Sequence, residues 1–87
     1  MEYAKNAEKN VLINLVDANP GESLKIVKIL GGFGLRNKLE ALGIREGIEI
    51  IKVNETLKRC PVIIQVCNSK IALGFGMAKK ILVEKKE

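Results

Sequence analysis

The chain contains no histidine and no tryptophan, and its 87 residues include only one tyrosine, two phenylalanines and two cysteines. Histidine is the side chain best suited to acid–base chemistry near neutral pH, and its imidazole is a common ligand of transition metals. No serine lies in a nucleophile-elbow motif, and the carboxylates, Glu46 and Glu49 among them, stand singly and are expected to be solvated. These absences predict a protein that is not an enzyme, with no catalytic and no cofactor-binding residue.

Long apolar segments are also missing. The sequence has no run of about 18 apolar residues and no charged start followed by an apolar segment. We therefore expect a cytoplasmic protein that does not insert directly into a membrane. Residues 1–10 are polar and are expected to form a flexible N-terminal extension, whereas residues 11–87 are expected to form a single domain.

The two cysteines, Cys60 and Cys67, lie at the two ends of one predicted strand. At roughly 3.3 Å per residue they are about 23 Å apart, whereas the α-carbons of a disulfide are roughly 4.4–6.8 Å apart. We expect two free thiols, with a structural role for Cys67. Two distant thiolates cannot form a tetrahedral metal site, so no intrinsic metal site is expected, although weak binding of Fe(II) or another divalent metal stays open.

The most informative segment is residues 31–47, GGFGLRNKLEALGIREG. Leu35, Leu39 and Leu42 are spaced at i, i+4 and i+7, which places all three on one face of a short helix. Gly43 follows the last leucine and is expected to end the helix in the left-handed conformation. The pattern predicts one short helix docked on an apolar surface through its three leucines.

The remaining apolar segments are short, rich in β-branched residues and separated by turn signals, which is typical of strands. A bulge near Val27 would let Ile26 and Ile29 point to the same side of the sheet. Within the strand at 61–67, we expect the side chains of Val62, Ile64 and Val66 to face the core. The expected strands are 11–16, 21–30, 48–53, 61–67, 70–73 and 81–83, with a polar loop at 54–59 and a turn at 68–69. Together with a single helical turn at 76–80, this content predicts a mainly β fold with one short inserted helix, a small barrel of five to six strands.

The only phenylalanines lie in two Gly-Phe-Gly sequences, at 32–34 and 74–76. Glycines before a helix can cradle phosphate, but this segment lacks the P-loop and dinucleotide-binding patterns, and a turn explains it. For Phe33 and Phe75, closure of the two ends of the core is favoured over an exposed aromatic contact.

The formal net charge is +5, from 15 basic and 10 acidic residues. A small basic barrel that binds RNA is therefore one alternative. Nucleic acid is nevertheless not the expected partner, because neither phenylalanine lies in a strand that alternates with basic residues, as a stacking platform requires.

The order of several motifs resembles the ferrous-iron-transport protein A (FeoA) family. These motifs are NPGE at 19–22, IVKILGG at 26–32, LEALGI at 39–44 followed by Gly47, Pro61-Val62, and IALG at 71–74 with Ala78 and Ile81. The resemblance covers about residues 11–84. It implies an SH3-like β-barrel with the leucine helix inserted after the first long strand.

The resemblance also implies a function. It implies a small cytosolic accessory or regulatory protein of ferrous iron uptake, which acts by protein–protein interaction with the cytosolic GTPase region of the Fe(II) transporter. The family is described as binding transition-metal ions, and the same domain occurs in metal-dependent repressors, so a standalone metal-regulator-type domain is a further alternative. The candidate partner-interface residues are Phe33, Arg36, Lys38 and Phe75, because aromatic and arginine side chains are typical of interface hot spots.

Overall fold

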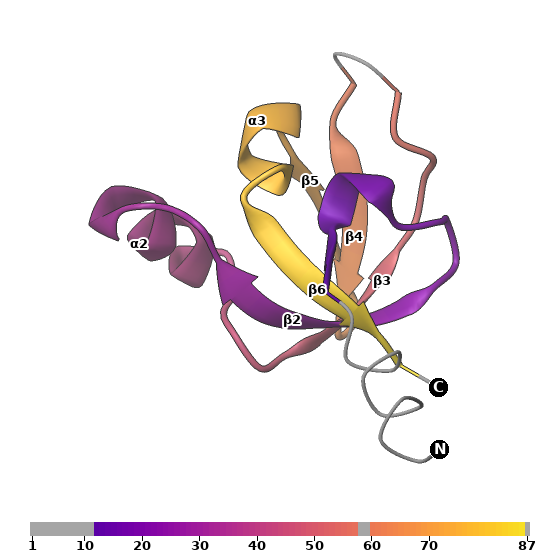
Figure 1. The fold of residues 1–87 in the computed structure, drawn as a ribbon, viewed down its shortest axis with the longest axis horizontal. Coiled ribbons are helices and arrows are strands. Elements are labelled where there is room, and N and C mark those ends of the chain that lie inside the picture. The colour runs from indigo at the N-terminus through magenta and orange to yellow at the C-terminus, as the bar shows by residue number, and fades with distance from the viewer. Residues whose placement is uncertain (1–11, 58–59, 87) are drawn as a thin grey trace.

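The computed structural model describes residues 12–57 and 60–86, which form one six-stranded antiparallel sheet with the strand order β1-β6-β2-β3-β4-β5. The strands are β1 Ile13–Asn14, β2 Ser23–Ile29, β3 Glu49–Lys52, β4 Val62–Val66, β5 Ser69–Leu73 and β6 Ile81–Lys85. Figure 1 shows this sheet strongly curved, with short helices beside it. The fold class expected from the sequence, mainly β with an SH3-like arrangement, is confirmed.

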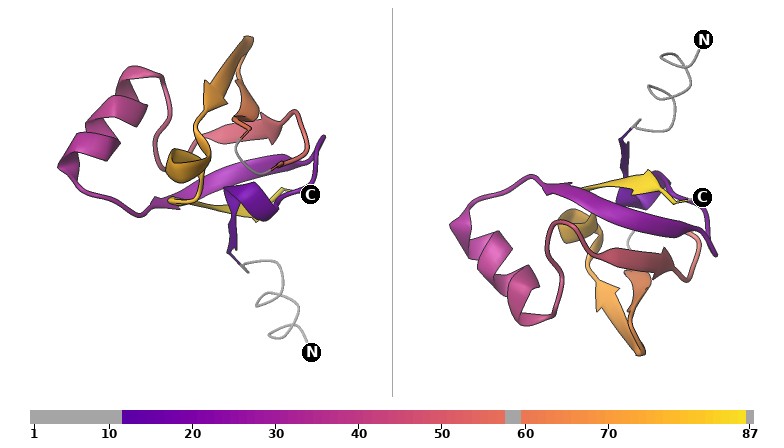
Figure 2. Two further views of the ribbon diagram at one scale, coloured as in Figure 1. Left: turned by 90° about the horizontal axis from the view of Figure 1, so that it is seen from above. Right: turned by 90° about the horizontal axis from the view of Figure 1, so that it is seen from below.

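In the part of the chain that the structure describes, three helical segments interrupt the strands: the 3₁₀ helix η1 Leu15–Asp17, α2 Phe33–Ala41 and α3 Phe75–Ala78. In both views of Figure 2, α2 lies to one side of the sheet, whereas α3 lies against it. The predicted single turn at 76–80 is confirmed, although it begins one residue earlier and ends two residues earlier than expected. The expected strand at 11–16 is confirmed only at β1, because the chain turns into η1 where the Asn14 side chain accepts the Val16 N–H at 3.2 Å.

The bulge expected in β2 is confirmed. The pairing of β2 with β6 shifts register between Ile26 and Lys28, so that Ile26 and Ile29 are both buried. An uninterrupted strand would place two residues at an odd separation on opposite faces, and the extra residue in β2 corrects this.

In β4, the expected core face is confirmed, with Val62 and Ile64 buried and Val66 half-buried. The expected strand end at Cys67 is wrong. Cys67 has φ 55° and lies in the two-residue turn after β4, with Val66 paired to Ser69. A positive φ cannot continue a strand, so the turn begins one residue earlier than expected.

Helix α2 ends as the sequence predicts. Gly43 has φ 85°, its N–H donates to the Glu40 carbonyl at 2.9 Å, and the Ile44 N–H donates to the Leu39 carbonyl at 2.9 Å. These two bonds form a Schellman motif. Leu39 is fully buried and Leu35 packs against the core at its edge, but the docking role expected for Leu42 is wrong because Leu42 is 44% exposed at the C-cap.

Among the described residues, the buried side chains form one apolar core between the sheet and its helices. Its members are Leu15, Ala18, Leu24, Ile26, Ile29, Leu39, Ile44, Ile50, Val62, Ile64, Leu73, Ala78, Ile81 and Val83. The expected flexible extension at residues 1–10 lies outside the described residues, as do residues 58–59 of the expected polar loop. The division into an extension and a single domain at 11–87 stays a prediction.

Candidate functional site

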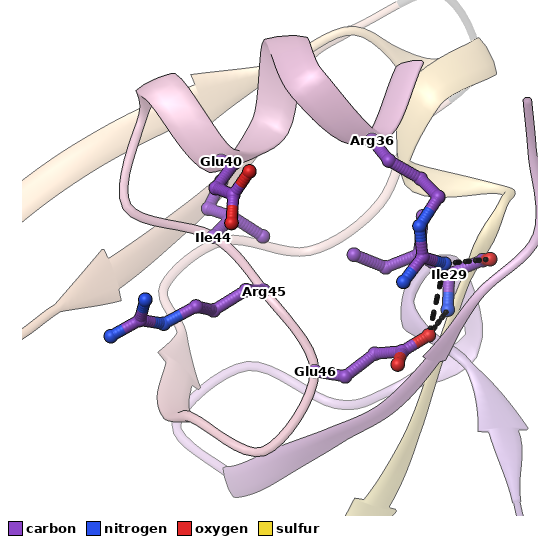
Figure 3. A pocket seen from close by; sticks show the side chains of 6 residues that line it. All are labelled: Ile29, Arg36, Glu40, Ile44, Arg45 and Glu46. Carbon is purple, nitrogen blue, oxygen red and sulfur yellow. Dashed lines mark hydrogen bonds and ion pairs between the residues drawn. The ribbon is translucent and has the colours of Figure 1, made fainter. Parts of the chain in front are cut away.

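Helix α2 is tied to the end of β2 by a cluster of polar bonds around Ile29 (Figure 3). One carboxylate oxygen of Glu46, Oε2, accepts the Ile29 N–H at 3.1 Å and a bond from Nη1 of Arg36 at 3.1 Å. The same Arg36 nitrogen donates to the Ile29 carbonyl at 3.2 Å. Glu46 is exposed, as expected, but it is also bonded to Arg36 and to the Ile29 backbone. We call Arg36, Glu46 and the Ile29 backbone the Ile29 clasp.

The clasp completes a backbone ladder that strand pairing leaves open. Strand β3 pairs with β2 only up to Lys25, and the chain before β3 reaches no further than Ile26, which accepts from Gly47 at 2.7 Å. Beyond that point the Ile29 N–H and carbonyl would face an empty edge, and unpaired backbone groups are costly when water cannot reach them. The guanidinium and carboxylate supply the missing donor and acceptor.

The same bonds set the electrostatics of the pair. The hydrogen bond from Arg36, followed by that from the Ile29 N–H, holds the pKa of the Glu46 carboxyl below its usual value. The carboxylate in turn raises the pKa of Arg36. Both side chains are more than a third exposed, so this pair fixes geometry more than it adds free energy.

A small hollow of about 60 Å³ lies beside the clasp. It is lined by Ile29, Arg36, Glu40, Ile44, Arg45 and Glu46 (Figure 3). A larger open hollow of about 670 Å³ lies between the end of α2 and the β4–β5 turn. Its lining combines Glu40, Gly43, Arg45, Ile48, Glu49, Val66 and Cys67. Across residues 12–57 and 60–86, no three side chains of the metal-ligating types come together.

Of the four candidate interface residues, Phe33 differs most from expectation. Its ring is 80% exposed at the first position of α2, so the core-closing role favoured from the sequence is wrong. Phe75 begins α3 and is half-buried, with the Lys79 ammonium 5.7 Å from its ring centroid. At that distance the two make a cation–π contact.

Lys38 is exposed on α2, as expected, whereas Arg36 is engaged in the clasp. The structure brings the α2 and α3 connections together at one end of the sheet, because the Leu30 N–H donates to the Lys80 carbonyl at 2.6 Å. The sequence did not show that Arg36 is bonded within the domain while Lys38 is exposed, because both lie on a helix of mixed polarity. The partner of Arg36 is ten residues away along the chain.

Sequence reasoning missed the buried Lys52. This side chain is fully buried at the end of β3, and its ammonium donates to the carbonyls of Val16 at 3.2 Å and Ala18 at 2.6 Å and to the Thr56 hydroxyl. The ammonium group has three N–H donors, and all three are satisfied. Burial lowers the pKa of Lys52, and the nearby acidic residue Asp17 opposes this shift. The lysine thus joins η1 to the segment after β3.

Comparison with known proteins places this arrangement among related domains. The family model described as "FeoA domain" matches residues 13–85. The chain is 37% identical over 73 residues to a Methanocaldococcus jannaschii protein named "Putative Fe(2+) transport protein A", with 84% of this chain and 87% of that protein covered.

Two solved structures are also similar. The crystal structure of an iron uptake regulatory protein (FeoA) has a TM-score of 0.80 and 33% sequence identity, and the match covers 87% of this chain and all of that one. A manganese-dependent transcriptional repressor has a TM-score of 0.79 at 13% identity, with 86% of this chain and 42% of the repressor covered. The likeness to the repressor shows the fold alone.

Proposed function

The chain belongs to the FeoA domain family, and we propose that it is a small cytoplasmic accessory protein of ferrous iron uptake. In this proposal it acts without catalysis, by binding the cytosolic GTPase region of the Fe(II) transporter. The match over residues 13–85 and the name of the Methanocaldococcus jannaschii relative support the link to iron transport. Within residues 12–57 and 60–86, no helix is long and apolar enough to cross a membrane.

The single observation that carries the binding role is the exposure of Phe33. A ring that is 80% exposed gains nothing from the core of its own chain, and burying it against a partner would remove that apolar surface from water. The ring stands at the first turn of α2, the helix that lies to the side of the sheet (Figure 2). We propose Phe33, Lys38 and Phe75 as contact residues, with Arg36 holding the helix that carries the first two.

Calorimetry against the transporter's cytosolic GTPase region, with and without guanine nucleotide, tests this function. We expect binding by the parent chain and a loss on the order of tenfold or more in Phe33→Ala, as for an interface hot spot. Leu57→Ala is the matched control, because Leu57 is also exposed, at 58%, but follows β3. If the parent does not bind in any nucleotide state while both proteins are folded, the proposal is wrong.

We also propose that the chain has no tight intrinsic metal site. The full sequence has no histidine, and the thiols Cys60 and Cys67 are both exposed. Fe(II) favours imidazole and carboxylate ligands, so weak binding at single surface carboxylates is the most this chain should offer. Titration of tag-free protein with Fe(II) should give at most weak binding, and a stoichiometric nanomolar complex would contradict the proposal.

Two alternatives have weaker support. The hypothesis of a metal-regulator-type domain is supported by the likeness to the repressor, but at 13% identity this likeness shows the fold alone. An RNA-binding barrel draws on the positive charge, but Phe33 and Phe75 both lie on helices, not in strands where they could form a stacking platform. Steep salt dependence of binding to generic RNA would favour the second alternative.

A further inference from the structure

Charged side chains of both signs lie at the start of β2. At the start of β2, three acidic residues surround the buried ammonium of Lys52 closely enough to act on its pKa, namely Asp17, Glu22 and Glu55. The Lys52 N–H donates to the Glu22 carbonyl at 3.2 Å, which fixes this group beside the first residues of the strand. Lys85 and Lys86 lie at the same end, where they pair with Glu22 at 3.2 Å and Glu49 at 2.8 Å, so the negative charge there is largely compensated.

Basic side chains gather at the other end of the same strand, about 20 Å away for seven residues at roughly 3.3 Å each. Lys28 lies opposite Leu82 in the ladder with β6, and the Lys80 carbonyl accepts the Leu30 N–H. Lys79 precedes Lys80 and covers the Phe75 ring. All three lysines are exposed.

Exposed apolar side chains accompany the lysines. Leu30 is 42% exposed directly after β2, and Phe33 follows it after two glycines with 80% of its surface exposed. Close packing requires glycine at position 31, because a Cβ there would come within 2.6 Å of Leu35 Cδ2. The close fit of Leu35 on Gly31 and the Ile29 clasp both hold α2 in place, so Phe33 is presented from a fixed support.

We infer that the end of the domain formed by Lys28, Leu30, Phe33, Lys79 and Lys80 docks on an acidic protein surface that contains an apolar pocket for the phenylalanine. We call this the basic end. The inference rests on the proposed function and gives the chemistry of the partner surface, a set of carboxylates around an aliphatic or aromatic pocket on the transporter's cytosolic region.

Charge and apolar content favour a protein over a lipid surface. Stable attachment to a bilayer needs a broad apolar face or a lipid anchor together with a basic patch, and the basic end exposes one ring and one leucine. A protein pocket, by contrast, can bury a single aromatic ring and surround it with carboxylates.

Arg36 has a different role in this surface. Its guanidinium is already bonded to Glu46 and to the Ile29 carbonyl, so it is a positioning residue that holds α2, and the lysines provide the charge for the partner. Arg36→Lys keeps the charge, but the lysine nitrogen lies one bond closer to the backbone than Nη1, which donates both bonds of the clasp. We therefore expect Arg36→Lys to weaken partner binding with no change in its salt dependence.

The test compares two reversals of charge that are chemically identical. Lys80→Glu changes the basic end, and Lys70→Glu changes an exposed lysine of β5, at the edge of the sheet. Calorimetry against the transporter's cytosolic region is performed at low and high salt, about 50 and 300 mM, after thermal melts show that both variants fold. At low salt, Lys80→Glu should weaken binding on the order of tenfold and Lys70→Glu only about twofold, with the gap narrowing at high salt.

The outcomes separate the inference from the proposed function. Binding by the parent with equal effects of the two reversals would overturn the basic end and leave the function standing. No binding by the parent would overturn both. A second experiment measures binding to phosphatidylglycerol vesicles. If the parent binds these vesicles in a salt-sensitive way and Lys80→Glu abolishes that binding while protein binding is unchanged, the partner of the basic end is a lipid surface and the inference is overturned. Phe33→Ser should lower protein binding without altering the salt dependence.

Discussion

Replacing Lys52 with methionine is expected to lower the free energy of unfolding by about 1–3 kcal/mol. The change keeps an unbranched apolar stem, shorter by the terminal atom alone, and removes the ammonium that bonds to Val16, Ala18 and Thr56. Methionine therefore leaves the volume of the core nearly unchanged, and the effect measures the polar contacts.

The magnitude follows from the surroundings of each acceptor. The bond to the Ala18 carbonyl is buried, so this oxygen would lose its donor without gaining water, at a cost of about 1–3 kcal/mol. The bonds to Val16 and Thr56 are part-buried, so water can replace the donor there. Removing a buried charge also relieves its desolvation cost, and this offsets part of the loss.

Urea unfolding is the assay, with Lys70→Met as the matched control, because Lys70 is exposed on β5 and its loss should stay within about 0.5 kcal/mol. For a domain of this size, a loss of 1 kcal/mol corresponds to a thermal midpoint lower by about 4–8 °C. Hydrogen exchange of the Ala18 amide, which closes η1 onto the Leu15 carbonyl at 3.2 Å, should also become faster. If Lys52→Met is as stable as Lys70→Met, desolvation of the ammonium outweighs its bonds and the reasoning is refuted.

Three further predictions concern the α2 region. Leu39→Ala should lower the free energy of unfolding, measured in urea melts, by about 2–5 kcal/mol because this side chain is fully buried. Leu42→Ala, at an exposed site, should lower it by less than about 1 kcal/mol. Equal losses for the two variants would contradict the docking of α2 through Leu39. Gly43→Ala should destabilise the domain by about 1–2 kcal/mol through its positive φ alone, because a Cβ there meets nothing within 4 Å. Gly34→Ala, inside the helix, should instead stabilise the domain by about 0.5–1 kcal/mol. If thermal melts show the same sign for both substitutions, the proposed helix cap is refuted. The pKa of Glu46 is lowered in the folded state, so its contribution to stability is present above the unfolded pKa and is lost as the pH falls through the folded pKa. The difference in unfolding free energy between the parent and Glu46→Gln should therefore shrink on acidification. A difference that stays constant with pH would contradict the clasp.

Much of the fold follows from short-range patterns in the sequence. The alternation of Val62 and Ile64 in β4 and the step from Ile26 to Ile29 in β2 are local features, because strand geometry fixes which residues share a face. Gly43 is likewise determined locally, since only a residue that tolerates positive φ closes the helix in this way. The family was also recognisable from the order of such motifs.

The sequence could not tell which phenylalanine is exposed and which is packed, because both lie in the same Gly-Phe-Gly context. One is 80% exposed at the start of α2 and the other is half-buried under a lysine at the start of α3. Which ring meets solvent depends on how far each helix lies from the sheet, and the packing of Leu39 and Leu35 against the core sets that distance for α2.

The polar contacts depended most on tertiary structure. Lys52 is the last residue of β3 and reads from the sequence as a solvated lysine, but its acceptors on Val16 and Ala18 are more than thirty residues earlier in the chain. Glu46 and Ile29 are likewise 17 residues apart. Apolar periodicity is set by backbone geometry within a few residues, so the sequence by itself determined the strands, the helix and its glycine stop. A buried ammonium or a carboxylate that replaces a strand partner needs donors and acceptors that only folding brings within bonding distance, so the tertiary structure alone decided where these charges lie.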